Sequence, residues 1–208
     1  MTWLSILLIG GLFGSVSVID QGESAYEKEE FEQAENHFRD ALKDPDYETQ
    51  TQNVNFNIAQ SLYRQDSLTA SKNLYSKLVG PREQLVRRNQ NLTTASWSYN
   101  NLGVITLASQ PGVQVNGGPK AAMAQDGQNM SEGQVEEAKA FFKDALRLDP
   151  ENQLARYNYE LLLRRQQKEM EQQQEQEEEQ EDQQEDQQNQ DQQNQDQNQD
   201  QQEQQQDQ

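Results

Sequence analysis

The chain has 208 residues, a net charge of −19 and no cysteine. A chain this acidic repels phosphate, which disfavours binding to nucleic acid. The lack of cysteine excludes disulfides, thiol catalysis and thiolate metal ligands within this sequence.

The first predicted element is the uncharged, largely apolar run from Trp3 to Ile19. A membrane-spanning helix needs about 20 apolar residues, whereas a signal-peptide core needs roughly 7–15 followed by small residues. Small residues stand at Gly14, Ser15 and Ser17, so the pattern favours export. No basic residue precedes Trp3, which leaves an uncleaved N-terminal membrane anchor as the alternative. We therefore expect residues 1–19 to be a signal peptide or an anchor.

Three later stretches place a small, a large and a further side chain at i, i+4 and i+7, which is one face of a helix; the last is small in two stretches and looser, Leu78, in the third. A further small residue precedes each stretch, and Pro45, Pro81 and Pro150 follow them. The sets are Gly22 with Ala34, Phe38 and Ala41; Ala59 with Ser71, Tyr75 and Leu78; and Gly103 with Ala138, Phe142 and Ala145. Because proline ends a helix, the sequence predicts three helix pairs and one more first helix, at 153–165.

These pairs make residues 20–165 one all-α domain, a solenoid of about three to four helical hairpins, with two interruptions. Residues 110–133 are rich in Gly and Pro, and we expect a flexible insertion within the third pair. Residues 81–94 carry Arg82, Arg87 and Arg88. This basic stretch is either a solvated link between pairs or a place that receives an acidic segment.

Residues 166–208 are a low-complexity tail of Gln, Glu and Asp with a net charge of −14. Such a tail has too few apolar side chains to form a core, so we expect it to be disordered or partly helical. Two roles stay open for it. It either steers a basic partner toward the domain or keeps the protein soluble.

A stack of helical hairpins presents a concave surface lined by its first helices. By hairpin geometry, we expect a peptide-binding face there that is made of aromatic and amide side chains. Its members are Tyr26, Phe56, Asn57, Gln60, Tyr63, Trp97, Asn100, Asn101, Val104, Tyr157, Asn158 and Arg164. Asn57, Asn101 and Asn158 occupy equivalent places, where an asparagine either holds a peptide or bonds to a neighbouring helix.

Candidates for chemistry are scarce in this chain. His37 is its single histidine and lies in a polar stretch, so we expect a surface position. Paired metal-ligand spacings, a phosphate-cradling glycine motif and a serine with a plausible histidine partner are all missing. The sequence therefore predicts no catalytic residue, no cofactor and no metal, and it disfavours an enzyme.

The spacing of small, aromatic and proline residues resembles the tetratricopeptide repeat, a helical hairpin of about 34 residues. A narrower resemblance rests on the segments Ala145–Asn152, Ala155–Leu162 and Tyr99–Gly103. Together with the insertion before the second helix of the last pair, they look like the tetratricopeptide proteins of the Bat aerotolerance operon, of the BatC type. The resemblance implies a bacterial envelope protein that works beside membrane-anchored partners containing a von Willebrand factor A domain.

From these patterns we expect an exported, non-catalytic scaffold for other proteins. It would be periplasmic, or anchored in the inner membrane with its repeats facing the periplasm. The alternative is a periplasmic chaperone or an adaptor of a cell-wall complex, which would differ in the proteins that it holds. Membrane contact is expected only through residues 3–19, if they are not cleaved.

Overall fold

The computed structural model describes residues 17–108 and 131–176, which are helical and contain no strand. The chain divides into two compact units, residues 1–162 and 163–208. In the second unit, residues 163–176 are helical. The first unit holds α1 (Val18–Glu27), α2 (Phe31–Ala41), the 3₁₀ helix η1 (Pro45–Gln50), α3 (Thr51–Arg64), α4 (Leu68–Lys77), α5 (Arg82–Arg87), α6 (Leu92–Ala108), α8 (Glu132–Leu148) and a helix over 153–162.

The folded part begins earlier than residue 20, the boundary that the apolar run suggested. Ser17 caps α1, because its hydroxyl accepts from the Asp20 N–H while the Asp20 carboxylate accepts from the Ser17 N–H, both at 3.1 Å. Ile19 is buried in the core. The rest of the predicted signal peptide or anchor, residues 1–16, lies outside the described residues. Within 17–108 and 131–176, no helix is both long and apolar enough to cross a membrane.

In the described part, the helices form three successive hairpins: α1 with α2, α3 with α4, and α6 with α8. The first two turns share one geometry, because Glu29 and Asp66 have positive φ angles of 64° and 60°. In both, the next N–H bonds to the carbonyl five positions back, as in a Schellman motif (Glu30 to Ala25 and Ser67 to Leu62). The turns lie 37 positions apart, which is also the spacing of Gly22 and Ala59.

Small residues of the first helices lie against aromatic rings of the second helices. A Cβ added to Gly22 would lie 2.7 Å from Cε1 of Phe38, and one added to Gly103 would lie 2.6 Å from Cε1 of Phe142. Both rings are fully buried. In the second hairpin, Ser71 donates its hydroxyl to the Ala59 carbonyl at 2.7 Å. The small residues thus allow helices of each pair to approach closely.

We expect Gly103→Ala to destabilise the protein by about 1–2 kcal/mol. Overpacking against the enclosed Phe142 ring costs about 1–3 kcal/mol, and the better helix propensity of alanine offsets up to about 1 kcal/mol of it. Gly133 in the first turn of α8 is the matched control, since a Cβ there would meet nothing within 4 Å. Gly133→Ala should be neutral or slightly stabilising in urea unfolding. Equal effects of both changes would show that helix propensity alone is being measured.

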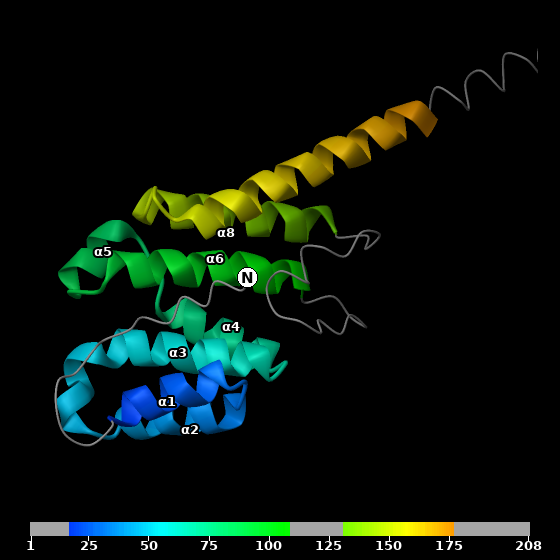
Figure 1. Ribbon diagram of the computed structural model, residues 1–208. Coiled ribbons are helices and arrows are strands. Elements are labelled where there is room, and N and C mark those ends of the chain that lie inside the picture. The colour runs from blue at the N-terminus through cyan, green and yellow to red at the C-terminus, as the bar shows by residue number, and fades with distance from the viewer. Residues whose placement is uncertain (1–16, 109–130, 177–208) are drawn as a thin grey trace, which may run out of the picture. The chain divides into compact units, whose positions relative to one another are not determined.

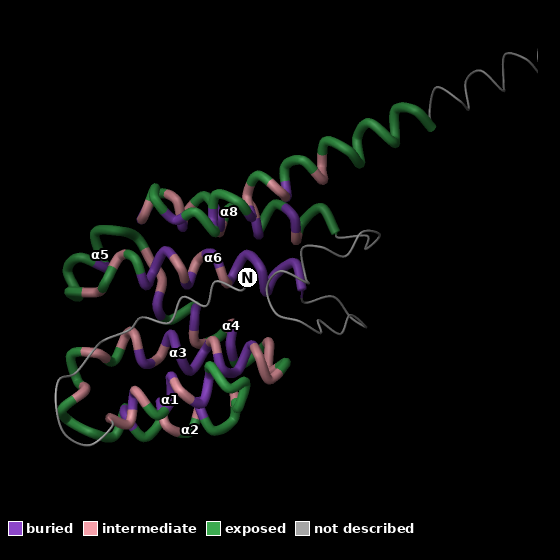
Figure 2. Tube along the Cα trace, viewed as in Figure 1, coloured by how far each residue is buried: buried purple, intermediate pink, exposed green. Residues whose placement is uncertain are grey.

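α2 contacts α3, α4 contacts α6, and the first helices α3 and α6 also contact each other. Figure 2 shows the result for α6, which is buried along most of its length between its neighbours. Hydrogen bonds join the first helices in sequence: Tyr26 to Gln60 at 3.3 Å, Thr94 to Asn53 at 2.8 Å, and Asn158 to Asn100 at 2.9 Å. The first helices therefore form one layer, which positions the candidate site.

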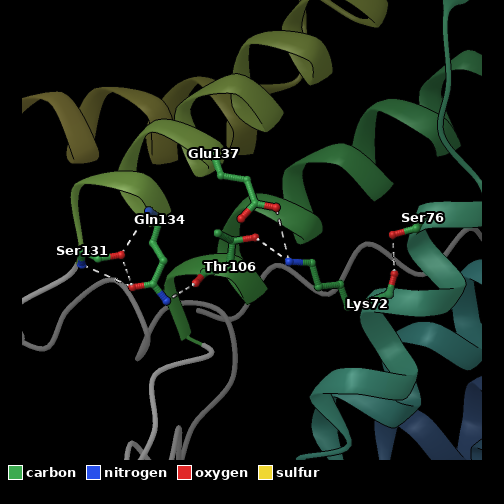
Figure 3. A network of polar contacts seen from close by, with 6 residues as sticks. All are labelled: Lys72, Ser76, Thr106, Ser131, Gln134 and Glu137. Atoms are coloured by element: carbon green, nitrogen blue, oxygen red, sulfur yellow. Dashed lines mark hydrogen bonds and ion pairs between the residues drawn. The ribbon is translucent and has the colours of Figure 1, made fainter.

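In the third hairpin, a hydrogen bond joins the end of α6 to the beginning of α8. α8 starts at Glu132, so the predicted insertion at 110–133 ends earlier than expected; its residues 110–130 lie outside the described residues. Ser131 and Gln134 form a capping box, and Gln134 also donates to the Thr106 carbonyl at 3.5 Å (Figure 3). Lys72 of α4 reaches both Thr106 and Glu137 at 3.4 Å, which joins the second hairpin to the third.

Candidate protein-interaction face

We call the surface formed by α1, α3, α6 and residues 153–162 the first-helix face. Gln60, Trp97 and Asn101 are half-buried on it, and Tyr157 is 55% exposed. Tyr26, Asn57, Tyr63, Asn100 and Asn158 keep at most 9% of their surface exposed. Arg164 is exposed but belongs to the second unit, so it is not part of this face as the structure describes it.

Phe56 and Val104, which we expected to contact a peptide, are core residues with at most 1% of their surface exposed. The ring of Phe56 lies edge-on to Tyr75 at 5.6 Å and to Trp97 at 6.3 Å between ring centroids. The assignment as contact residues is therefore corrected. Phe56 instead supports Trp97, whose own ring remains partly accessible.

The predicted asparagines bond to one another and to neighbouring helices. The Asn158 side-chain amide donates to Oδ1 of Asn100 at 2.9 Å. The Asn100 amide in turn donates to Oδ1 of Asn101 at 3.2 Å. Asn101 then donates to the Tyr75 hydroxyl at 2.9 Å. For Asn101 and Asn158, the helix–helix role that the sequence left open is the one observed. Asn57 is buried on α3.

A polar and aromatic cluster joins α1 to α3 at the first end of the face. The Tyr26 hydroxyl donates to Oε1 of Gln60 at 3.3 Å. The Arg64 guanidinium lies 4.2 Å from the centroid of the Phe31 ring and 5.9 Å from that of Tyr26. Burial raises the pKa of the Tyr26 phenol, while the Arg64 charge acts in the opposite direction. Tyr26 therefore stays neutral and serves as a hydrogen-bond donor.

Glu23 is a buried carboxyl of α1 that we did not predict. It lies on α1 one turn before Tyr26 and is only 6% exposed. Its Oε1 has no hydrogen-bond partner within the described residues. Burial, and then the carboxylates of Asp20 and Glu27, raise the pKa of the Glu23 carboxyl from 4.5 to about 7. The sequence held one signal for it, because Glu23 stands 37 positions before Gln60, just as Tyr26 stands 37 before Tyr63.

A separate hollow lies beside the basic stretch after α4. Its cavity of about 430 Å³ is bordered by η1, α3, α4 and the turn after α5, with Lys77 and Arg88 among its lining residues. Arg82 of the same stretch lies close to the Leu148 carbonyl, at 3.4 Å, and Leu85 is buried. The predicted basic patch is therefore partly a packed link and partly an exposed cationic surface.

No model of a known protein family matches this chain, and no curated protein matches it significantly. Among residues 17–108 and 131–176, histidines and carboxylates do not gather in groups of three or more that would hold a metal ion. What the face offers is partly exposed aromatic rings beside amides, which suits non-covalent recognition.

Proposed function

We propose that this protein is a non-catalytic scaffold of tetratricopeptide type that holds other proteins on its first-helix face. The observation that carries the proposal is the repeated contact between a small residue and a ring, at Gly22 with Phe38 and at Gly103 with Phe142. The 37-residue offset between the first two hairpins supports it, because it places equivalent side chains next to each other. Repetition of one hairpin generates an extended surface of first helices.

Trp97 and Tyr157 are the side chains that would supply most of the binding energy. Trp97 is half-buried and packs edge-on against the Phe56 ring, and Tyr157 is exposed. Buried aromatic anchors dominate protein interfaces because they remove much apolar area at small entropic cost. The half-buried amide of Gln60 lies on the same face and suits the backbone of an extended peptide.

We further propose that the protein works at the bacterial cell envelope, as the Bat aerotolerance resemblance suggests. The apolar run before α1 supports export, and the segment Ala155–Leu162 carries the resemblance most specifically. The partners would be membrane-anchored proteins containing a von Willebrand factor A domain. A periplasmic chaperone would use the same face but would bind many unfolded clients rather than one set of partners.

The test is a crosslinking pull-down from membranes with matched variants of the full chain. Trp97→Ser with Tyr157→Ala changes the first-helix face, whereas Lys77→Ser with Val86→Ala changes exposed residues of α4 and α5. We expect the first pair to reduce the recovery of von Willebrand factor A-domain partners at least tenfold, a loss of about 1.4 kcal/mol or more of binding free energy. The second pair should leave recovery unchanged.

Circular dichroism and thermal unfolding would confirm that both variants remain folded. Undiminished recovery with the first pair, or equal loss with both, would overturn the assignment of the face. Removal of residues 177–208 from the unaltered protein would show separately whether the acidic tail contributes to capture.

A further inference from the structure

The hollow after α4 is a concave surface separate from the accessible side chains of the first-helix face. Its volume is about 430 Å³, and its lining comes from η1, the start of α3, α4 and the turn after α5. Gln60, Trp97 and Tyr157 are not among its lining residues. The volume lies within the usual range of ligand pockets, about 300–1,000 Å³. A ligand in the hollow would therefore leave the first-helix face free.

Hydrogen bonds fix the walls of the hollow. Gln52 of α3 donates to the Asn91 carbonyl at 3.0 Å and accepts from the Asn91 N–H at 2.6 Å, which ties α3 to the turn after α5. The Thr51 hydroxyl donates to the Glu48 carbonyl at 2.7 Å, which ties α3 to η1. The turn itself is held in a left-handed conformation at Asn89, with a φ of 53°. The hollow is thus formed before a ligand arrives, which lowers the cost of binding.

Two cations of the lining have no countercharge. Lys77 and Arg88 are both exposed, and among the residues that the structure describes neither forms an ion pair. Glu48 also lines the hollow but pairs with neither of them. Each cation stands at the C-terminal end of its helix, where the helix dipole favours a positive charge. The dipole accounts for one cation on each helix, but not for two around one hollow.

The lining selects a carboxylate on a peptide. Lys77 and Arg88 repel cations, whereas a guanidinium binds a carboxylate through two parallel N–H bonds and an ammonium adds a point charge. The oxygen of the Asn55 amide can accept a peptide N–H, and the exposed Asn89 amide can also donate to a peptide carbonyl. Leu74 adds an apolar part to the same lining. An acidic segment that also carries an apolar side chain satisfies all of these groups.

Other anions satisfy fewer of these groups. A free phosphate offers neither a peptide backbone nor an apolar side chain, and nucleic acid is repelled by a chain with a net charge of −19. Residues 177–208 of the chain itself contain only Glu, Gln, Asp and Asn, so they bring no apolar side chain. The lining therefore favours a segment of another protein.

We propose that the hollow binds an acidic segment of a second partner protein. An Asp or Glu carboxylate of that segment bonds to Lys77 and Arg88, and an apolar neighbour packs on Leu74. This site goes beyond the proposed function, because it is separate from the accessible side chains of the first-helix face and takes a different protein. A scaffold with two such sites raises the effective concentration of one bound protein near the other.

The test titrates the full chain with blocked tetrapeptides, followed by ¹H–¹⁵N NMR of the backbone amides. The acidic peptide is Leu-Asp-Glu-Leu, and the neutral peptide Leu-Asn-Gln-Leu differs from it only in the two carboxylates. A third peptide, Gln-Asp-Glu-Gln, imitates residues 177–208. Lys77→Gln with Arg88→Gln removes both cations of the hollow. Lys28→Gln with Arg87→Gln is the matched control, because it removes the same charge from exposed positions outside the lining.

We expect the acidic peptide to shift the amides around Asn89 and to bind the wild type and the control within about twofold of each other. Lys77→Gln with Arg88→Gln should weaken binding about tenfold or more, because the carboxylate loses both of its charged partners. The neutral and the tail-like peptide should bind the wild type about tenfold or more weakly than the acidic one, because each lacks a group that the lining recognises.

No binding of the acidic peptide, or equal binding of the neutral one, would exclude a carboxylate site. Equal losses in the two double variants would reduce the effect to general attraction between charges. Equal binding of the tail-like peptide, or displacement of the acidic peptide by equimolar inorganic phosphate, would overturn the assignment to a partner segment. Peptide binding as expected, in a protein whose first-helix face captures no partner, would contradict the proposed function alone.

Discussion

Replacing Phe142 by Ala should lower the free energy of unfolding by about 3–5 kcal/mol, the usual cost of removing a fully buried aromatic ring. Phe142 has no exposed surface, and its ring lies against Gly103 of α6. The cavity left behind cannot collapse easily, because α6 and α8 already touch at the glycine. Urea unfolding followed by circular dichroism at 222 nm would measure the change.

The neighbouring Phe141 provides a control of the same residue type in the same turn. It is half-buried and packs on Tyr99 with 6.2 Å between ring centroids. Phe141→Ala should therefore cost clearly less, about 1–2 kcal/mol, because less apolar area is lost. If Phe141→Ala proved as costly as Phe142→Ala, or Phe142→Ala cost below about 1 kcal/mol, the packing of the third hairpin would be wrong.

The second large effect is a dependence of stability on pH that originates at Glu23. Its carboxyl has a pKa of about 7 when folded, against 4.5 as its ordinary value. A raised carboxyl pKa means that the folded state holds the proton more tightly. Its contribution to stability is fully present below pH 4.5 and is lost as the pH rises through about 7.

We therefore expect the wild type to lose about 2–3 kcal/mol between pH 4.5 and pH 8 relative to Glu23→Gln. Glutamine imitates the protonated carboxyl and does not titrate, so the two proteins should be equally stable near pH 4. Above pH 8, Glu23→Gln should be the more stable. The exposed Glu32→Gln should run parallel to the wild type at every pH. If the stability of Glu23→Gln also ran parallel to that of the wild type at every pH, the Glu23 carboxyl would not be buried as the structure shows.

The all-α fold was predictable because its signals are local and repeated. A ring between two small residues at helical spacing needs a glycine or alanine opposite it, and Gly22 and Gly103 were found in that way. The residues at which the helices begin were harder to predict. Val18 and Ile19 read as part of the apolar run before α1, and only the bonds between Ser17 and Asp20 show that the helix has begun.

The candidate site was predictable only in its location. Register places a residue on the first-helix face, but it does not say how far the neighbouring helix covers the residue. Phe56 therefore looked available, although its ring is enclosed by Tyr75 and Trp97. Asparagines at equivalent positions read as ligands for a peptide, whereas the hydrogen bond from Asn158 to Asn100 depends on a contact between helices far apart in sequence.

Site-specific photocrosslinking reports which face of the protein a partner touches. p-Benzoylphenylalanine would replace Trp97 or Tyr157 on the first-helix face, and exposed Asn73 of α4 or Ala140 of α8 on the second helices. We predict adducts with the same partner from positions 97 and 157 after irradiation of intact cells, and none from 73 and 140. Adducts from 73 and 140 without any from 97 and 157 would show that partners bind the second helices and not the first-helix face.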